Sequence, residues 1–247
     1  MVRFTFLAVM VFVLSLNGNA QYGANLFPQP LQVAYGKGSF ALNKLTLPAS
    51  ADPDIAFSIR EFKKDVEQKI GKKIHPAPSA SVATLRFTIR KKGLVLPDTT
   101  ALLVNSDRES YVLKVDRNGI FIDAVTSSGF FYAIQTLKQL IGQDASLPYV
   151  QINDKPAFPY RGVMMDFAHG GLLKVQEIKA QIDYLAQWKA NQYYFYNEVS
   201  IALDGFEQLN FKQSYSKAEI SEIIAYGKER HIDIIPFVAL YGHLHDL

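Results

Sequence analysis

The strongest constraint on the fold is a regular alternation of strand-like and helix-like segments in the second part of the chain. Three apolar segments have the length of strands, at residues 161–167, 192–199 and 232–240. The segments between them repeat their apolar residues at helical spacing, and the second opens with a capping box from Ser216 to Glu219. Strands joined by helices in this way form right-handed crossovers and a parallel sheet. The pattern predicts an α/β unit of the order βαβαβ.

The length of this region limits what it can complete. A (β/α)8 TIM barrel needs about 250 residues, whereas 88 residues run from Tyr160 to Leu247. We therefore expect the opening βαβαβ of a TIM barrel, in a sequence that is a truncated piece of a longer protein. The alternative is a small, open, three-stranded α/β domain that is complete in itself.

The preceding region, residues 21–155, mixes helices and strands. Asp52 before a proline is typical of a helix start, and Gly71 is typical of the end of that helix. Apolar residues alternate over 111–125, on both sides of Asn118-Gly119, and predict a hairpin with this dipeptide as its two-residue turn. We expect an N-terminal α+β domain in which helices accompany a sheet.

A proline-rich segment separates the two regions. Pro156 and Pro159 stand three positions apart, which excludes a continuous helix or a central strand there. We therefore place the domain boundary at this segment, with the N-terminal domain at 21–155 and the partial TIM-barrel domain at 156–247.

The first 20 residues have the features of a signal peptide. Arg3 supplies the positive charge, residues 4–16 are apolar, and Gly18 and Ala20 are small residues at the predicted cleavage site. The apolar run is shorter than the roughly 20 residues that a membrane-spanning helix needs. We expect a periplasmic or secreted protein without a membrane span after cleavage, and the alternative is an uncleaved N-terminal anchor.

The composition excludes several functional classes. The chain has no Cys, which excludes disulfides, iron–sulfur clusters, Cys-based zinc sites and a thiol nucleophile. Its 26 Lys and Arg nearly balance its 23 Asp and Glu, and no concentrated basic face indicates a nucleic-acid partner.

Polar side chains follow the three predicted strands at their carboxyl ends. These ends meet at one edge of a parallel sheet, where α/β proteins place their active sites. Carboxylates, imidazoles and a guanidinium at such an edge can hold a polyhydroxylated ligand through charge-assisted hydrogen bonds. The candidate substrate-binding residues are Arg161, Asp166, His169, Asn197, Glu198 and His243.

Each candidate has a structural alternative. Asp166 and Glu198 could be helix caps or partners in loop salt bridges, and Arg161 could belong to a buried ion pair. A metal site is a further alternative, because two histidines and an acid follow the third strand and could combine with His169 and Glu198. Those three residues are His243, His245 and Asp246. The aromatic run 193–196 could stack on a sugar, but alternate members of a strand face opposite sides, so about half must be core.

Four segments together resemble glycoside hydrolase family 20, the β-N-acetylhexosaminidases. The similarity covers nearly the whole mature chain in the expected order. The segments are the hairpin and helix at residues 111–140, Phe158–Asp166 (FPYRGVMMD), Trp188–Gln192 (WKANQ), and residues 226–236 followed by Gly242-His243.

The resemblance implies a glycosidase that removes terminal N-acetylhexosamine from glycans by substrate-assisted, retaining hydrolysis. In that family the substrate's N-acetyl oxygen attacks the anomeric carbon, while an adjacent Asp-Glu pair orients the acetamido group and protonates the leaving oxygen. No metal or other cofactor is implied. The resemblance also implies that Arg161 and His243 bind hydroxyls of the terminal sugar and that Asp166 lies near this pocket. Because the Asp-Glu pair belongs after the fourth strand, we assign no catalytic residue up to Leu247 and expect the 247-residue chain alone to be inactive.

Two departures from the family pattern concern specificity. His169 stands where many members have Arg, and Tyr196-Asn197-Glu198 stands where many have His-x-x-Asp. The second form resembles the hexosaminidase D-like branch. The alternative function is a non-catalytic carbohydrate-binding module on the same scaffold. In both cases the expected partners are N-acetylhexosamine-containing glycans, and the sequence predicts no particular oligomeric state.

Overall fold

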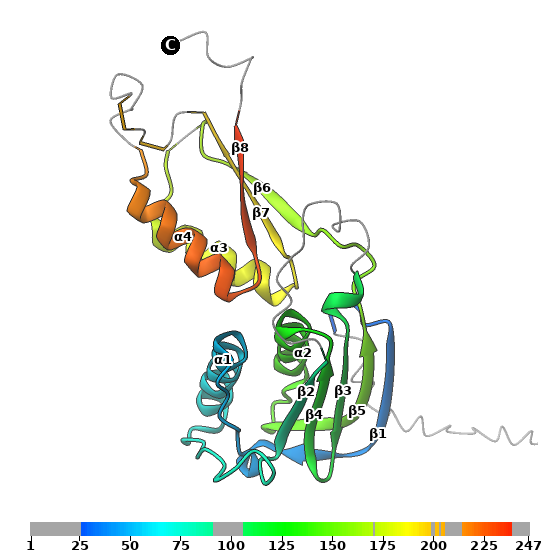
Figure 1. Cartoon of the computed structure of the whole chain (residues 1–247). Helices are drawn as coiled ribbons and strands as arrows, with labels where there is room; N and C mark the ends of the chain where they lie inside the picture. Colours follow the sequence, from blue (N-terminus) through cyan, green and yellow to red (C-terminus); the bar gives the residue numbers. More distant parts are fainter. Residues whose placement is uncertain are drawn as a thin grey trace, which may run out of the picture.

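The computed structural model describes residues 26–90, 106–169, 171–198, 201–202, 204–205 and 214–238. Two sheets organise these residues, a five-stranded one in the lower part of Figure 1 and a three-stranded one in the upper part. Each sheet has two long helices beside it. The prediction of a mixed α/β chain is therefore confirmed.

The five-stranded sheet has the order β1-β5-β3-β4-β2, and all its pairs are antiparallel except β2 with β4. Its helices pack on one face, and Phe62, Leu113 and Phe130 are completely buried between the layers. Burial of side chains of this size stabilises the fold by about 1.5–3 kcal/mol each. The elements are β1 (Gln32–Ala41), η2 (Leu42–Lys44), α1 (Pro53–Ile70), β2 (Leu85–Ile89), η4 (Ser106–Glu109), β3 (Tyr111–Asp116), β4 (Gly119–Ala124), α2 (Ser127–Leu140) and β5 (Ser146–Asp154).

Helix α1 begins and ends where the sequence predicts. The side chain of Asp52 accepts hydrogen bonds from the backbone N–H groups of Asp54 at 3.0 Å and Ile55 at 3.2 Å. Gly71 takes a left-handed φ of 66° and donates its N–H to the carbonyl of Glu67. These bonds satisfy backbone groups that the helix itself leaves without partners.

The β3–β4 hairpin confirms the predicted strand pair but corrects the predicted turn. Asp116 pairs with Gly119, so the two turn residues are Arg117 and Asn118. Both keep a negative φ, whereas Gly119 has a φ of +129°. A tight turn followed by a glycine of positive φ replaces the type I′ turn that Asn-Gly favours. The N–H of Asn118 donates to Oδ1 of Asp116 at 2.8 Å, which stabilises the observed form.

We expect Gly119→Ala to lower the free energy of unfolding by more than about 2 kcal/mol. A Cβ at this position would lie 2.1 Å from the carbonyl oxygen of Thr84, which already accepts a hydrogen bond from the N–H of Ile120 at 2.8 Å. Gly71→Ala is the matched control, because Gly71 also has a positive φ but its Cβ would meet nothing within 4 Å. Urea denaturation measures both losses, and equal losses would contradict the steric argument.

The three-stranded sheet is parallel, in the order β6-β7-β8, with the two helices as crossovers between its strands. Three strands and two helices thus alternate as the sequence predicts, although the extension of this sheet into a TIM barrel stays a prediction. The elements are β6 (Gly162–Asp166), α3 (Val175–Gln187), β7 (Gln192–Asn197), α4 (Lys217–Glu229) and β8 (Asp233–Val238).

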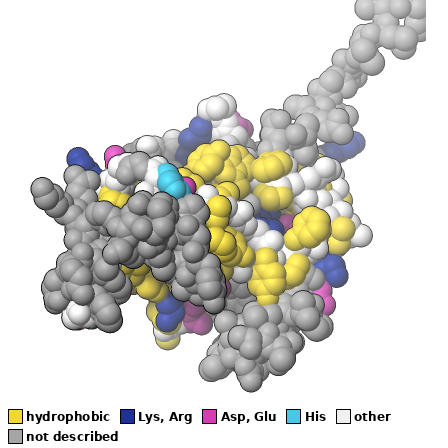
Figure 2. Space-filling model, turned by 90° about the horizontal axis from the view of Figure 1, so that it is seen from above, with side chains coloured by type: hydrophobic (Ala, Val, Ile, Leu, Met, Phe, Trp, Pro, Cys, Tyr) yellow, Lys and Arg dark blue, Asp and Glu magenta, His cyan; other side chains and the backbone are white. Residues whose placement is uncertain are grey.

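The two faces of this sheet differ in burial. Tyr193 and Phe195 point toward the helices and are buried with Ile178 of α3 and Ile223 of α4. On the opposite face, Met164 is 58% exposed and Phe237 is 49% exposed. Figure 2 looks down on the end of the molecule where these strands finish and shows exposed hydrophobic side chains there. The alternation predicted for the aromatic run of β7 is therefore confirmed.

No helix within the described ranges is long and apolar enough to cross a membrane. The predicted signal peptide lies outside those ranges, so cleavage and export stay predictions.

Candidate functional site

Asp166, the last residue of β6, holds the turn that follows this strand. Its Oδ1 accepts hydrogen bonds from the backbone N–H groups of Ala168 at 2.8 Å and His169 at 3.0 Å. Its Oδ2 lies 2.9 Å from Nδ1 of His169. One carboxylate therefore fixes both the backbone of the turn and the orientation of the imidazole.

Glu198 reaches the same imidazole from the end of β7. Its Oε1 accepts a hydrogen bond from the hydroxyl of Tyr196 at 2.8 Å and lies 3.9 Å from Nε2 of His169. The ring of Tyr196 is nearly parallel to the imidazole, with an interplanar angle of 11° and centroids 6.2 Å apart. The structure thus brings together three of the predicted site residues, which we call the edge cluster: Asp166, His169 and Glu198.

The contacts within and beside the edge cluster shift the pKa values of Asp166, His169 and Tyr196. The hydrogen bond from the His169 side chain lowers the pKa of Asp166, and further bonds from the backbone N–H groups act in the same direction. The same side-chain bond raises the pKa of His169, with a smaller contribution from Glu198. The bond to Glu198 raises the pKa of Tyr196, which keeps this hydroxyl a neutral donor. The cluster offers carboxylate oxygens and an imidazole beside solvent.

Asn197, the remaining candidate of β7, lies away from the edge cluster. Asn197 is 5% exposed and shares the helix-facing side of β7 with Tyr193 and Phe195, so its side chain does not join the edge cluster. Tyr196, which is not among the predicted site residues, contacts the cluster instead, because it lies on the opposite face of β7. His243 lies outside the described residues.

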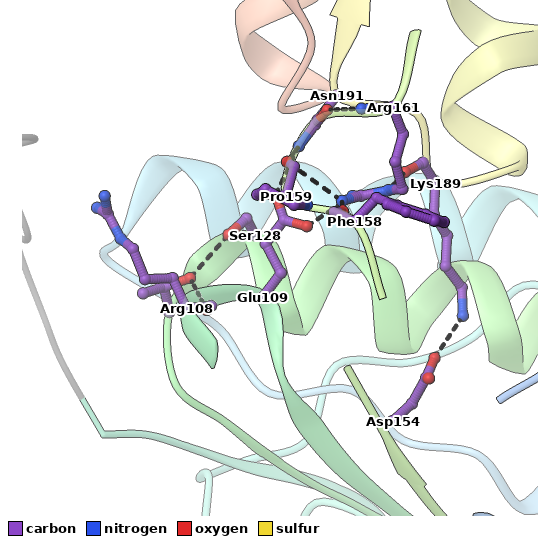
Figure 3. A network of polar contacts seen from close by, with 10 residues as sticks. Arg108, Glu109, Ser128, Asp154, Phe158, Pro159, Arg161, Lys189 and Asn191 are labelled. Carbon is purple, nitrogen blue, oxygen red and sulfur yellow. Dashed lines mark hydrogen bonds and ion pairs between the residues drawn. The ribbon is translucent and has the colours of Figure 1, made fainter. Parts of the chain in front are cut away.

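Arg161, a further candidate, lies away from the edge cluster. Arg161 precedes β6, at the opposite end of that strand from Asp166, and its side chain turns toward the five-stranded sheet (Figure 3). The guanidinium donates to Oε2 of Glu109 at 2.6 Å, to the Lys189 carbonyl at 2.9 Å and to the Phe158 carbonyl at 2.7 Å. All three guanidinium nitrogens therefore have protein partners. In this structure Arg161 takes part in a buried ion pair, which is the structural alternative given above.

The Lys-x-Asn motif before β7 makes the neighbouring contacts of this junction. The Asn191 amide donates to Oε1 of Glu109 at 3.0 Å, and its oxygen accepts the N–H of Arg161 at 2.8 Å. Lys189 Nζ donates to Oδ2 of Asp154 at 2.9 Å (Figure 3). It also donates to the Tyr111 hydroxyl at 2.9 Å. Burial lowers the pKa of Lys189. The motif therefore joins the two sheets and contributes nothing to the edge cluster.

A metal site has no support within the described ranges. No group of three or more His, Asp or Glu side chains there is placed to hold a metal ion. Two members of the alternative metal set, His169 and Glu198, do lie near each other, whereas the three residues after β8 lie outside those ranges.

Comparison with known proteins identifies the family. The sequence model described as glycosyl hydrolase family 20, domain 2, matches residues 23–155, which is more than half of the chain. The chain belongs to glycoside hydrolase family 20. The narrower resemblance to the hexosaminidase D-like branch stays a prediction.

Known relatives of this family 20 chain are much longer than it is. A curated β-hexosaminidase of Porphyromonas gingivalis is 26% identical over 98% of this chain and 35% of its own length. The N,N'-diacetylchitobiase of Vibrio harveyi is 28% identical over 88% of this chain and 27% of its own length. The crystal structure of a Flavobacterium johnsoniae chitobiase superposes with a TM-score of 0.73 and 27% identity, over 89% of this chain and 35% of that one. The chain thus spans about a third of the length of these relatives.

The edge cluster of the family 20 chain can bind hydroxyl groups. Each carboxylate is an acceptor for hydroxyl hydrogens, and the imidazole can donate to a ligand oxygen. Because Asp166 is already held by two backbone N–H groups and His169, the cluster keeps its geometry without a ligand. Such preorganised groups lose little conformational entropy when a sugar binds.

Proposed function

We propose that the protein is an exported β-N-acetylhexosaminidase that removes terminal N-acetylhexosamine residues from glycans. The observation that carries the proposal is the edge cluster, at the carboxyl end of a parallel sheet in a family 20 chain. The proposal is supported by relatives named β-hexosaminidase and N,N'-diacetylchitobiase. In it, strands β6, β7 and β8 are the first three strands of a TIM barrel, and the cluster lies at the mouth of that barrel.

The proposed reaction is substrate-assisted and retaining, as the family resemblance implies. The N-acetyl oxygen of the terminal sugar forms a bond to the anomeric carbon as the glycosidic bond breaks, and water later opens this intermediate. The described residues act in binding: Asp166 and Glu198 accept hydroxyl hydrogens of the terminal sugar, and His169 donates to a sugar oxygen. They hold the ring while its reacting atoms align, and such positioning lowers the barrier. The proposal assigns none of the described residues as the general acid.

We expect His169→Ala to lower kcat/KM on an aryl N-acetyl-β-glucosaminide roughly 10- to 100-fold, mostly through KM. A hydrogen bond from a charged group contributes about 1.5–3 kcal/mol, and the loss of the imidazole also leaves Asp166 without its side-chain partner. Steady-state kinetics on N-acetylglucosaminide and N-acetylgalactosaminide substrates measures the effect in the full-length protein. His75→Ala is the control, because His75 is an exposed histidine of the other sheet's region.

Two results would contradict the proposal. If the folded full-length protein releases neither aminosugar, hydrolysis is excluded, and saturable binding without turnover would then favour the carbohydrate-binding module. If His169→Ala behaves like His75→Ala, the edge cluster does not contact the sugar.

A further inference from the structure

A second cavity lies at the opposite end of the three-stranded sheet from the edge cluster. It is a cleft of about 400 Å³ between the helices of the two sheets. Helices α3 and α4 run antiparallel to their strands, so the carboxyl ends of these helices, which border the cleft, lie at the amino ends of β6–β8. Its walls come from α1, α2, the end of α3 and the residue after α4. Its volume falls within the range of about 300–1,000 Å³ that is typical of small-molecule sites.

Three polar groups of this interhelical cleft lack partners among the described residues, and one of them is the indole N–H of Trp188. Gln135 of α2 is only 4% exposed, yet its side-chain amide makes no hydrogen bond there. Glu61 of α1 lines the same cleft, and its carboxylate forms no ion pair within the described ranges. The amide atoms of Gln135 are not among the side-chain atoms that are shielded from solvent without a partner, so they stay accessible from the cleft and keep their donor and acceptor capacity. A ligand that offers both hydroxyl donors and oxygen acceptors would satisfy these groups.

The other charged groups of the cleft already have partners. Lys138 lies 2.8 Å from Asp65, and Arg230 forms an ion pair with Asp183. The guanidinium of Arg230 also lies 5.0 Å from the ring centroid of Phe57. With these two pairs neutralised, Glu61 leaves the cleft with one negative charge, which disfavours anionic ligands.

Aromatic rings supply the apolar part of the lining. Phe57, Phe131 and Trp188 border the cleft from three different helices. Trp188 packs edge-to-face against Phe27 at 5.4 Å and against Tyr184 at 5.9 Å, which fixes its indole. Phe57 and Phe131 are only 5% and 2% exposed, so Trp188 is the ring of these three that a ligand in the cleft can reach. A fixed indole beside an amide and a carboxylate matches the two kinds of surface on a sugar ring, apolar C–H and polar O–H.

We propose that the interhelical cleft is a second binding site, which takes one or two sugar units of a neutral glycan. The choice of a glycan among neutral polyhydroxylated ligands rests on the proposed function. In this site the Gln135 amide donates to and accepts from sugar oxygens and hydroxyls, and Glu61 accepts a hydroxyl hydrogen. The site is separate from the edge cluster and takes no part in hydrolysis. It would hold a glycan chain near the enzyme while another chain end is cleaved.

Trp188 provides the readout, because it borders the cleft. We expect N-acetylglucosamine, the proposed product, to change the tryptophan fluorescence of the full-length protein saturably, and the difference between the parent and Trp188→Phe gives the part of this change that reports on the cleft. Gln135→Leu should weaken the fluorescence-detected affinity at least about fivefold. It should leave hydrolysis of the aryl glycoside unchanged. Glu61→Gln supplies an independent test from the other wall, and Gln151→Leu, at an exposed position of β5, is the control.

The two sites can fail separately in this experiment. His169→Ala should impair hydrolysis and leave the fluorescence titration intact, which is the converse of Gln135→Leu. The second site is overturned if N-acetylglucosamine gives no Trp188-dependent signal, or if Gln135→Leu and Glu61→Gln both bind like the parent protein. Equal affinity for N-acetylglucosamine 6-sulfate would overturn the assignment to neutral sugars. Loss of hydrolysis alone would contradict the proposed function and leave this cleft supported.

Discussion

Replacement of Arg161 by Met is expected to lower the free energy of unfolding by about 3–5 kcal/mol, the usual cost of removing one partner of a buried ion pair. The side chains of Arg161 and Glu109 are only 19% and 15% exposed, and their closest atoms lie 2.6 Å apart. Without the guanidinium, the carboxylate of Glu109 loses its cationic partner in a largely buried site. The carbonyls of Phe158 and Lys189 also lose their donor. Urea denaturation of the full-length protein measures the loss.

Arg90 provides a matched control for this substitution. It forms a two-point ion pair with Asp123, through bonds of 2.9 and 2.7 Å, but the two side chains are 54% and 44% exposed. Exposed pairs of this kind contribute about 0–1 kcal/mol, so Arg90→Met should have a small effect. Similar losses for both variants would contradict the role of Arg161 at the junction. If instead Arg161→Met keeps its stability and loses affinity for N-acetylhexosamine, the family-based role in sugar binding would be correct.

The sequence predicts local structure well because the determinants lie close together along the chain. The cap of α1 depends on Asp52 and the two residues that follow Pro53, and the hairpin on alternation over a few positions. The turn between β3 and β4 is the local exception. There, Asn-Gly favours a type I′ turn, whereas the pairing of Asp116 with Gly119 shifts the turn by one residue. Next to this turn, the N–H of Ile120 donates to the carbonyl of Thr84, which belongs to a segment far away in sequence, so local sequence does not show this contact.

The sequence could not decide between the two roles of Arg161, sugar binding and a buried ion pair, because its partners are distant in sequence. Glu109 is 52 positions away and follows no periodic pattern with Arg161 or with Asn191, which it also contacts. The position of Arg161 before β6 did contain a usable signal. Active-site residues of parallel sheets cluster at the carboxyl ends of strands, and Arg161 stands at the amino end of its strand.

The edge cluster was more accessible to sequence analysis. The rule that parallel strands end at one edge predicts that Asp166 and Glu198 approach each other, and the structure bridges them through His169. The prediction named Asn197, whereas Tyr196 contacts the cluster, and the difference depends on which side of β7 faces the helices. Because Tyr193 and Phe195 are core residues, alternation places Asn197 with them.

We expect His231 alone to lower the free energy of unfolding by about 3 kcal/mol as the pH decreases from 6.5 toward 4. Burial lowers the pKa of this imidazole to about 4, while Asp52 and Asp54 oppose the shift only in part. Its Nε2 is shielded from solvent without a partner in the described ranges, and its ring lies 5.2 Å from that of Phe131. The folded state therefore binds this proton less readily than the unfolded state, so the loss begins below pH 6.5 and is complete near pH 4.

His231→Asn isolates this contribution, because Asn tolerates the left-handed φ of 57° at this position and does not titrate in this range. Asp166 and Glu67 have lowered pKa values, so they also lose stabilisation as pH falls, and the parent and the variant share that loss. The difference in unfolding free energy between them, measured by urea denaturation at pH 7 and pH 4, should therefore change by about 3 kcal/mol in favour of the variant. The exposed His75→Asn controls for the exchange itself. A difference that does not change with pH would show that the imidazole of His231 accepts its proton in place, and that the contact between α2 and the end of α4 relaxes to admit water.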